Sequence, residues 1–230
     1  MTSIVLNSTN EALALKDVVV RAHSISYENG KRASDVIISL LLLPVILILL
    51  PFIAFAIKIE SPGPILFRQK RVGKDGKHFM LLKFRSTHRT SVDETVGWGA
   101  EGEHVYRNVG KFLRKSYLDE LPQVKNVLKG EMSVIGPRPE RPEFVEILKK
   151  EIPYYELRLM IKPGLTGWAQ VNMENRAFAN EAKEKLRFDL YYIKHRSIWL
   201  DFKILLKSLA ILTRRTGRER CRIDTVVFPC

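Results

Sequence analysis

Cysteine is scarce in this sequence: the 230 residues include two, Cys221 and Cys230, both in the polar C-terminal stretch. A disulfide framework or a cysteine-based metal site needs more partners than these, so neither is expected. The first thirty residues contain no apolar core of a signal peptide, so we expect no cleavable secretory signal and a chain that stays mainly in the cytoplasm. Internal repeats and low-complexity runs are also missing, which excludes a repeat array.

Acidic residues are in deficit, because 38 Lys and Arg face 25 Asp and Glu and give a net charge of +13. Such a chain suits anionic partners: nucleic acid, acidic lipid head groups or phosphorylated substrates. Its basic residues are scattered and form no single stripe, and no nucleic-acid module is recognisable, so a nucleic-acid partner is not expected. The length and the 46% apolar content predict one domain with one substantial core.

One long segment lacks charge altogether. Val36–Ile57 contains 22 residues and would reach roughly 33 Å as a straight helix, which matches the hydrocarbon core of a bilayer. A wholly apolar circumference does not suit a surface helix, and a buried core helix of this length would be unusual in so small a domain. We therefore predict a membrane helix.

Pro44 bears on whether this helix crosses the bilayer. A proline inside a helix kinks it, and a kinked segment can turn back, although prolines are also common in spanning helices. The positive-inside rule selects no orientation because basic residues flank both ends. The residues alone therefore leave a re-entrant hairpin and a kinked span open. The flanking charges are Lys31 and Arg32 before the segment and Lys58, Arg68, Lys70 and Arg71 after it.

The rest of the chain predicts a helix-rich α+β domain. A Gly-rich turn between two apolar runs indicates a β-hairpin, and a polar stretch after it indicates a loop that could cover a site. The last predicted helix is amphipathic, so it could lie at a membrane interface or pack on the core. The predicted elements are strands at Ile65–Gln69 and Phe79–Phe84, a loop at 86–107, helices at Leu118–Lys129 (stopped by Gly130), Phe144–Lys150, Ala177–Lys194 and Trp199–Arg215, and a tail from Thr216.

Asp119 and Glu120 stand side by side at the predicted start of the Leu118–Lys129 helix. The positive end of the helix dipole favours ionised carboxylates there by roughly 0.3 to 1 kcal/mol. An ionised aspartate is a usable nucleophile toward phosphorus, and a neighbouring carboxylate could hold Mg²⁺ against substrate phosphates. Acidic residues are also favoured in a first helical turn without any catalytic role, and that alternative stays open.

Four basic residues in turns or near element ends could converge on a diphosphate. Arg138 lies between two prolines, and a stiff loop limits the entropy that a bidentate phosphate contact would cost. Each cation taken singly suits a solvated surface position equally well. The candidate anion clamp comprises Lys83, Arg85, Arg114 and Arg138.

These segments together resemble the bacterial sugar transferase family, the monotopic phosphoglycosyl transferases that start glycan assembly on polyprenyl phosphate. The resemblance runs from about Lys31 to about Arg215, and its motifs follow the family's order. They are the basic start and apolar segment with Pro44, SPGPILFRQKRVG, KFRST, RKSYLDELPQVKNVLKGEMSVIGPRP, KPGLTGWAQVN, and Asp189-Leu190-Tyr191-Tyr192 followed by DFKILLKSL.

The resemblance implies a ping-pong transfer of sugar-1-phosphate from a UDP-sugar to polyprenyl (undecaprenyl) phosphate. Asp119 would attack the β-phosphate, UMP would leave, and the polyprenyl phosphate would intercept the covalent phosphosugar. Glu120 would bind Mg²⁺. The residues tied by the resemblance to substrate binding or active-site structure are Arg114, Arg138 and Asp189, together with Lys83, whose role is less defined.

The resemblance also implies a re-entrant helix at 36–57 that bends at Pro44 and a location on the cytoplasmic face of the bacterial inner membrane. Residues 31–215 would form the catalytic domain, after a polar leader at 1–30 and before a tail at 216–230. The expected process is the first membrane step of exopolysaccharide, O-antigen or glycoprotein glycan assembly, with inner-membrane lipids, downstream glycosyltransferases and further copies of the chain as possible partners. The multi-span N-terminal extension of larger members is not in this sequence, so the short form is expected.

Three positions depart from the family pattern and could alter the sugar pocket: Thr87, Tyr117 and Met173. The main alternative function is a non-catalytic, membrane-anchored protein that binds anionic lipid or polyphosphate. It explains the charge and the apolar segment equally well, but it gives no reason for an Asp-Glu pair between arginines.

Overall fold

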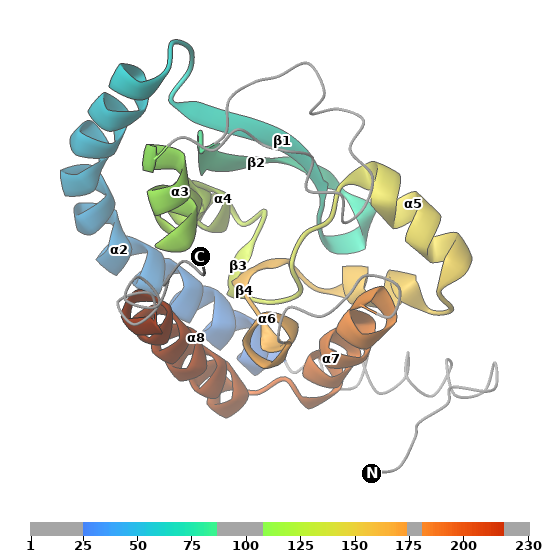
Figure 1. Cartoon of the computed structure of the whole chain (residues 1–230). Helices are drawn as coiled ribbons and strands as arrows, with labels where there is room; N and C mark the ends of the chain where they lie inside the picture. The colour runs from blue at the N-terminus through green and yellow to red at the C-terminus, as the bar shows by residue number, and fades with distance from the viewer. Residues whose placement is uncertain (1–24, 87–107, 174–180, 219–230) are drawn as a thin grey trace, which may run out of the picture.

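A computed structural model describes residues 25–86, 108–173 and 181–218. Most of the predicted loop at 86–107, the first 24 residues, the start of the predicted helix at Ala177 and most of the predicted tail lie outside these ranges. The described part is a helix-rich α+β domain, as predicted (Figure 1). Its elements are α2 (Ile25–Glu60), β1 (Leu66–Val72), η1 (Lys74–Gly76), β2 (His78–Phe84), α3 (Asn108–Lys115), η2 (Leu118–Gln123), α4 (Val124–Lys129), β3 (Ser133–Ile135), α5 (Pro142–Glu151), η3 (Tyr155–Met160), β4 (Gly164–Thr166), α6 (Trp168–Asn172), α7 (Glu181–His195) and α8 (Ile198–Arg218).

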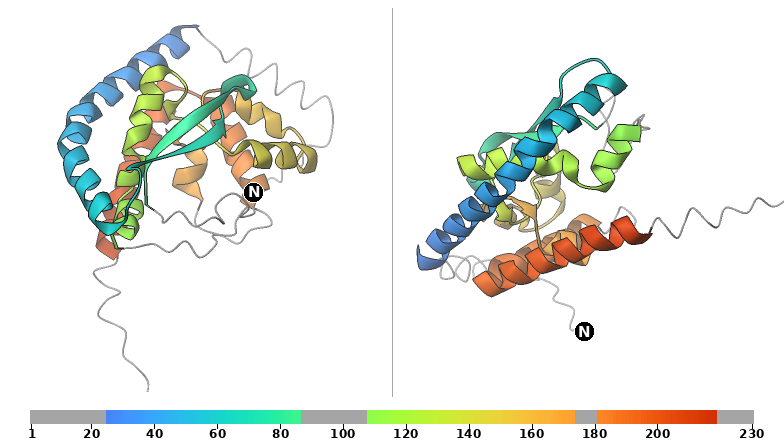
Figure 2. Two further views of the ribbon diagram at one scale, coloured as in Figure 1. Left: turned by 90° about the horizontal axis from the view of Figure 1, so that it is seen from above. Right: turned by 90° about the vertical axis from the view of Figure 1, so that its left-hand side faces the viewer.

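Helix α2 contains the whole apolar segment and begins at Ile25, within the predicted leader. Its helical trace continues through Pro44 and Pro51, and it curves along one side of the domain (Figures 1 and 2). Among the described residues, α2 is the one helix long and apolar enough to cross a membrane. Its outer side exposes large apolar side chains, with Leu41 and Phe52 each 70% exposed. This surface has the character that a lipid-facing helix requires.

Both ends of α2 are attached to the same domain. Near its start, the Asp35 Oδ1 accepts hydrogen bonds from the Val134 N–H and the Ser133 hydroxyl, each at 2.9 Å. Near its end, Ile57 packs in a cluster with Phe84 and Leu113, away from solvent. The apolar segment therefore contacts the same domain at both of its ends.

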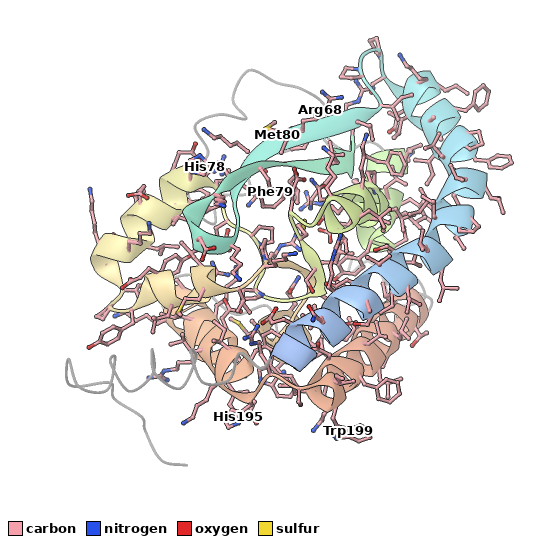
Figure 3. All side chains as sticks on the ribbon, turned by 180° about the vertical axis from the view of Figure 1, so that it is seen from behind. Arg68, His78, Phe79, Met80, His195 and Trp199 are labelled. Carbon is pink, nitrogen blue, oxygen red and sulfur yellow. The ribbon has the colours of Figure 1, made fainter. Side chains whose placement is uncertain are left out.

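The predicted β-hairpin is present, and its antiparallel strands pair Phe67 with Lys83 and Arg71 with Phe79. Phe79 points into the domain and is 8% exposed, whereas Met80 lies on the outer face and is 47% exposed (Figure 3). This alternation is that of a strand with one buried face. The main core lies under this hairpin and takes side chains from β2, α4, β3, α7 and α8, including Phe79, Leu81, Val127, Val134, Ile193 and Ile204.

A second sheet, the parallel pair β3–β4, was not predicted from the sequence. Its two strands approach so closely that a Cβ on Gly164 would lie 2.1 Å from the Gly136 nitrogen. A Cβ on Gly167 would likewise lie 2.2 Å from the Gly136 oxygen. Glycine is needed at these positions because no side chain fits, and the result is a fixed start for the loop that contains Arg138.

The helix predicted at Leu118–Lys129 consists of two parts, the 3₁₀ segment η2 and the α-helix α4. Tyr117, with a φ of 56°, sets η2 apart from α3, and Gly130, with a φ of 82°, ends α4 as predicted. The C-terminal helices α7 and α8 are also found where the pattern indicated. Helix α8 buries Ile204 completely and exposes Trp199 by 75%, so one face packs on the core and another faces outward (Figure 3).

Candidate active site

Three separate segments bring the predicted site residues together. Lys83 comes from the end of β2, Asp119 and Glu120 from η2, and Arg138 from the loop after β3. The Glu120 Oε1 accepts a hydrogen bond from the Lys83 ammonium at 2.7 Å and another from the Arg138 Nη2 at 2.8 Å. Lys83 and Arg138 are therefore both bonded to Glu120, and their predicted convergence on a diphosphate stays a prediction.

Glu120 is held in its ionised form. Its side chain is 14% exposed, and burial alone would raise its pKa. The charges of Arg138 and Lys83 outweigh burial and lower the pKa of Glu120 to about 2. Glu120 is thus a permanent anion at neutral pH.

The pKa values of the two cations that contact Glu120 shift in opposite directions. Glu120 is the main cause of a raised pKa at Arg138, whose side chain remains 39% exposed. Burial, with repulsion from Arg138, lowers the pKa of Lys83 in spite of Glu120. The partly exposed Arg138 is therefore the cation that can hold Glu120 and also meet an anionic ligand.

Asp119 lies in a different environment, although it is the next residue along the chain. It is 5% exposed, and burial raises its pKa above the ordinary value, against the attraction of Lys83 and Arg114. The dipole argument from sequence predicted that the helix start favours ionisation of both carboxylates. For Asp119 burial works against that preference, and the six-residue 3₁₀ segment offers no long dipole to offset it.

Asp189 lies behind the site and does not join the cluster around Glu120. It is 2% exposed, and its Oδ2 accepts a hydrogen bond from the Nε of Arg158 at 3.0 Å and forms an ion pair with the Nη2 at 2.9 Å. The same Arg158 Nη2 donates to the backbone carbonyl of Arg138 at 2.8 Å. Asp189 is therefore linked to the site through Arg158.

Arg85 is directed away from Glu120, toward the turn that follows α2. Its guanidinium donates to the carbonyl oxygens of Ser61 and Pro62 at 2.7 and 2.8 Å, and to the Ser61 hydroxyl at 2.8 Å. These contacts tie the turn after α2 to the end of β2, two residues beyond Lys83. A role for Arg85 in substrate binding stays a prediction.

The donor groups can be compared with what Mg²⁺ requires. Within the described ranges, no group of three or more His, Cys, Asp or Glu side chains is arranged to hold a metal by itself. Mg²⁺ is usually bound through one or two carboxylates and completed by water and substrate phosphates. Asp119 and Glu120 fit that pattern as a pair, whereas a closed, all-protein metal site does not fit.

Sequence reasoning missed Arg158 and Glu140. Burial opposes the ionisation of Glu140, but Lys185, Arg158 and Arg71 outweigh it and lower its pKa to about 2. Glu140 directly follows the Gly-Pro-Arg-Pro motif and could have been suspected from that position. Arg158 lies in an unpatterned stretch, and no periodicity or motif distinguishes it.

The described part of the chain combines a buried carboxylate, a second carboxylate bonded to two cations, and a helix long and apolar enough to cross a membrane. The chain belongs to the bacterial sugar transferase family, which matches residues 26–215. The resemblance inferred from the sequence motifs is thereby confirmed.

Several named relatives are similar over most of this chain. The UDP-N-acetylgalactosamine-undecaprenyl-phosphate N-acetylgalactosaminephosphotransferase of Aeromonas hydrophila is 44% identical over 184 residues, 80% of this chain and 44% of the relative. The UDP-glucose:undecaprenyl-phosphate glucose-1-phosphate transferase of Escherichia coli K12 is 44% identical over 181 residues, 78% of this chain and 39% of the relative. The chain thus spans about two fifths of the length of these two proteins. The exopolysaccharide production protein PSS of Rhizobium leguminosarum bv. phaseoli is 37% identical over 194 residues, 81% of this chain and 97% of the relative.

Proposed function

We propose that this chain transfers a sugar-1-phosphate from a UDP-sugar to a polyprenyl phosphate such as undecaprenyl phosphate and releases UMP. The observation that carries this proposal is the buried Asp119 beside Glu120, which two cations keep ionised. The printed names of two relatives, which describe sugar-phosphate transfer to undecaprenyl phosphate, support it.

The reaction takes place in two displacements at one phosphorus atom. In the first, an Asp119 carboxylate oxygen forms a bond to the β-phosphorus, and the bond from that phosphorus to the bridging oxygen breaks. The electron pair leaves on UMP. In the second, an oxygen of the polyprenyl phosphate forms a bond to the same phosphorus and the bond to Asp119 breaks. The carboxylate is restored, and the product is a polyprenyl diphosphate sugar.

The surroundings of Asp119 suit a nucleophile. Burial removes the water that would otherwise stabilise the carboxylate, so the ionised form is reactive when it is present. The positive charges of Lys83, Arg114 and Arg138 lower the pKa of Asp119 against burial, and their field would also attract the diphosphate of the donor. Glu120 and Asp119 would hold Mg²⁺, which when bound neutralises charge on the phosphates.

The proposal includes a re-entrant topology for α2, with the catalytic domain on the cytoplasmic face. Its support is the attachment of both ends of α2 to one domain, through Asp35 at the start and Ile57 at the end. A straight span would carry these ends to opposite faces of the bilayer, where one domain cannot contact both. This arrangement keeps the site on the side of the membrane where the phosphate of a polyprenyl lipid lies.

The test of the reaction uses purified protein in detergent, undecaprenyl phosphate, Mg²⁺ and a panel of UDP-sugars that includes UDP-glucose and UDP-N-acetylgalactosamine. We expect UMP release with at least one donor and its loss in Asp119→Asn. Asp75→Asn is the matched control, because Asp75 is exposed and has a φ of 56°, which asparagine tolerates. No UMP release from the unaltered protein with any donor would contradict the proposal and favour a binding protein.

The topology is tested by cysteine labelling in a background with Cys221 and Cys230 replaced by serine. Single cysteines replace the exposed residues Asn29, before the apolar segment, and Pro64, after it. If α2 is re-entrant, with both ends on the inside, each cysteine is protected from an impermeant maleimide in intact cells and labelled after lysis. Labelling of one end in intact cells would contradict the hairpin.

A further inference from the structure

The loop that contains Arg138 is bonded along its whole length. Four consecutive carbonyl groups, those of residues 137 to 140, each accept a hydrogen bond, and the donors come from three parts of the domain, β1, η3 and β4. A loop between two elements is normally mobile, because its backbone groups are free to exchange between partners and water. The backbone acceptors of this loop are all hydrogen-bonded, so the loop holds Arg138 rigidly. The donors are the Gly164 N–H to Pro137 at 2.9 Å, the Arg158 Nη2 to Arg138 at 2.8 Å, the Arg71 Nη1 to Pro139 at 3.0 Å and the Val72 N–H to Glu140 at 3.0 Å.

Arg158 is the donor that acts at Arg138 itself. Its side chain is 3% exposed, and besides Arg138 it contacts Asp189, the Tyr155 hydroxyl at 2.7 Å and the Glu140 carboxylate at 4.0 Å. It therefore reaches the backbone of Arg138 and the side chain of Glu140, two residues further on. A planar guanidinium with five N–H donors can make this set of contacts, whereas an ammonium cannot.

Asp189 accounts for the orientation of Arg158. Its Oδ2 accepts a hydrogen bond from the Arg158 Nε and forms an ion pair with the Nη2, and these two contacts fix the plane of the guanidinium. An unpaired arginine in so buried a position would be strongly unfavourable, so the two residues form one unit. At 2% exposure, Asp189 has no surface with which to contact a substrate.

We infer that Arg158, oriented by Asp189, is a positioning residue that sets where the Arg138 guanidinium meets Glu120 and the donor diphosphate. The pair acts through the Arg138 backbone and touches no substrate. This inference rests on the proposed function for the part that Arg138 has in phosphate binding. The position of the Arg138 loop can be tested without any turnover.

The first test is hydrogen–deuterium exchange of the protein in detergent, read by mass spectrometry on peptides that cover residues 136–145. Lysine keeps the charge of Arg158 but cannot make the same set of hydrogen bonds, so we expect Arg158→Lys to exchange faster in these peptides, where the Gly136 N–H is bonded to the Thr166 carbonyl at 2.9 Å. Arg196→Lys is the matched control, because Arg196 is similarly buried and pairs with Glu28, far from this loop. Unchanged exchange in Arg158→Lys would overturn the inference.

The second test is a double-mutant cycle on kcat/KM with Arg138→Gln. A misplacement near 1 Å can cost roughly a hundredfold in rate. We therefore expect Arg158→Lys to lower kcat/KM by about that factor when Arg138 is present, and by less than about threefold when Gln replaces it. Equal losses in both backgrounds would mean a general structural role and would overturn the inference.

Asp189→Asn provides a second variant if Arg158→Lys fails to fold. Asparagine keeps the shape of Asp189 and one acceptor, so smaller changes in exchange rate and in kcat/KM are expected. The exchange rate of residues 136–145 in Asp189→Asn should lie between the rates of the wild type and of Arg158→Lys. The exchange test separates this inference from the proposed function. Suppose that the protein never releases UMP, but that residues 136–145 exchange faster when Arg158 is changed. This result would refute the proposed function and leave the positioning role of Arg158 intact.

Discussion

Glu120 provides the sharpest energetic prediction, because its pKa of about 2 lies well below the ordinary 4.5. Each unit of pKa shift corresponds to about 1.36 kcal/mol, so the ionised Glu120 contributes about 3 kcal/mol to stability at neutral pH. The side chain is 14% exposed, so solvent screening takes little from this figure. Glu120→Gln removes the charge and leaves Lys83 and Arg138 facing a neutral amide.

We expect Glu120→Gln to lower the melting temperature by roughly 6 to 12 °C at pH 7, at about 2 to 4 °C per kcal/mol for a chain of this size. A carboxyl group with a depressed pKa stabilises the folded state above its unfolded pKa and loses that contribution as the pH falls through its folded pKa. The difference between wild type and variant should therefore shrink between pH 4.5 and pH 2. Thermal unfolding in detergent, followed by intrinsic fluorescence across this range, measures both effects.

Two controls accompany this measurement. Glu143→Gln changes an exposed carboxylate and should shift stability by less than about 0.5 kcal/mol. Adding Lys83→Met to Glu120→Gln removes one buried cation that has lost its partner, so part of the stability should return. The reasoning is refuted if Glu120→Gln melts within 1 °C of wild type at pH 7, or if acid widens the difference.

The remaining predictions concern Asp119 and the glycines under the Arg138 loop. Burial raises the pKa of Asp119, so its charge opposes folding at neutral pH. Asp119→Asn should therefore be inactive, yet have a higher melting temperature than wild type at pH 7. This difference in melting temperature should shrink as the pH falls, because the wild-type carboxyl then takes up a proton. Gly164→Ala would place a Cβ 2.1 Å from the Gly136 nitrogen, so we expect a loss of about 1 to 3 kcal/mol in thermal unfolding and a loss of UMP release. Gly30→Ala, whose Cβ would meet nothing nearer than 3.9 Å, should be neutral or stabilising because alanine favours the helix.

Local signals in the sequence predicted several parts of this structure. Turn residues between two apolar runs located the β-hairpin, and the φ of Gly130 confirms the predicted end of α4. The uncharged segment identified α2, and motif order identified the family. Lys83 and Arg138 were predicted to be site residues because a diphosphate needs cations, and both donate hydrogen bonds to Glu120.

Other features depend on tertiary contacts that no local pattern encodes. The strands β3 and β4 are three residues each, too short for any alternation to show. Tyr117 adopts a positive φ only because the fold requires a break between α3 and η2 there. The raised pKa of Asp119 follows from desolvation, and the contact of Arg158 with Arg138 joins residues 20 apart. Burial and loop contacts of this kind appear only once the chain is folded.

The central claim is that Asp119 forms a covalent bond to the transferred phosphate. Its most direct test is intact mass spectrometry of the protein mixed with a UDP-sugar that supports turnover and Mg²⁺, without polyprenyl phosphate, followed by peptide mapping. The account predicts one phosphosugar adduct on the peptide that contains Asp119, accompanied by one equivalent of UMP and discharged when undecaprenyl phosphate is added. UMP release at the normal rate from Asp119→Asn, or an adduct on any other residue, would contradict it.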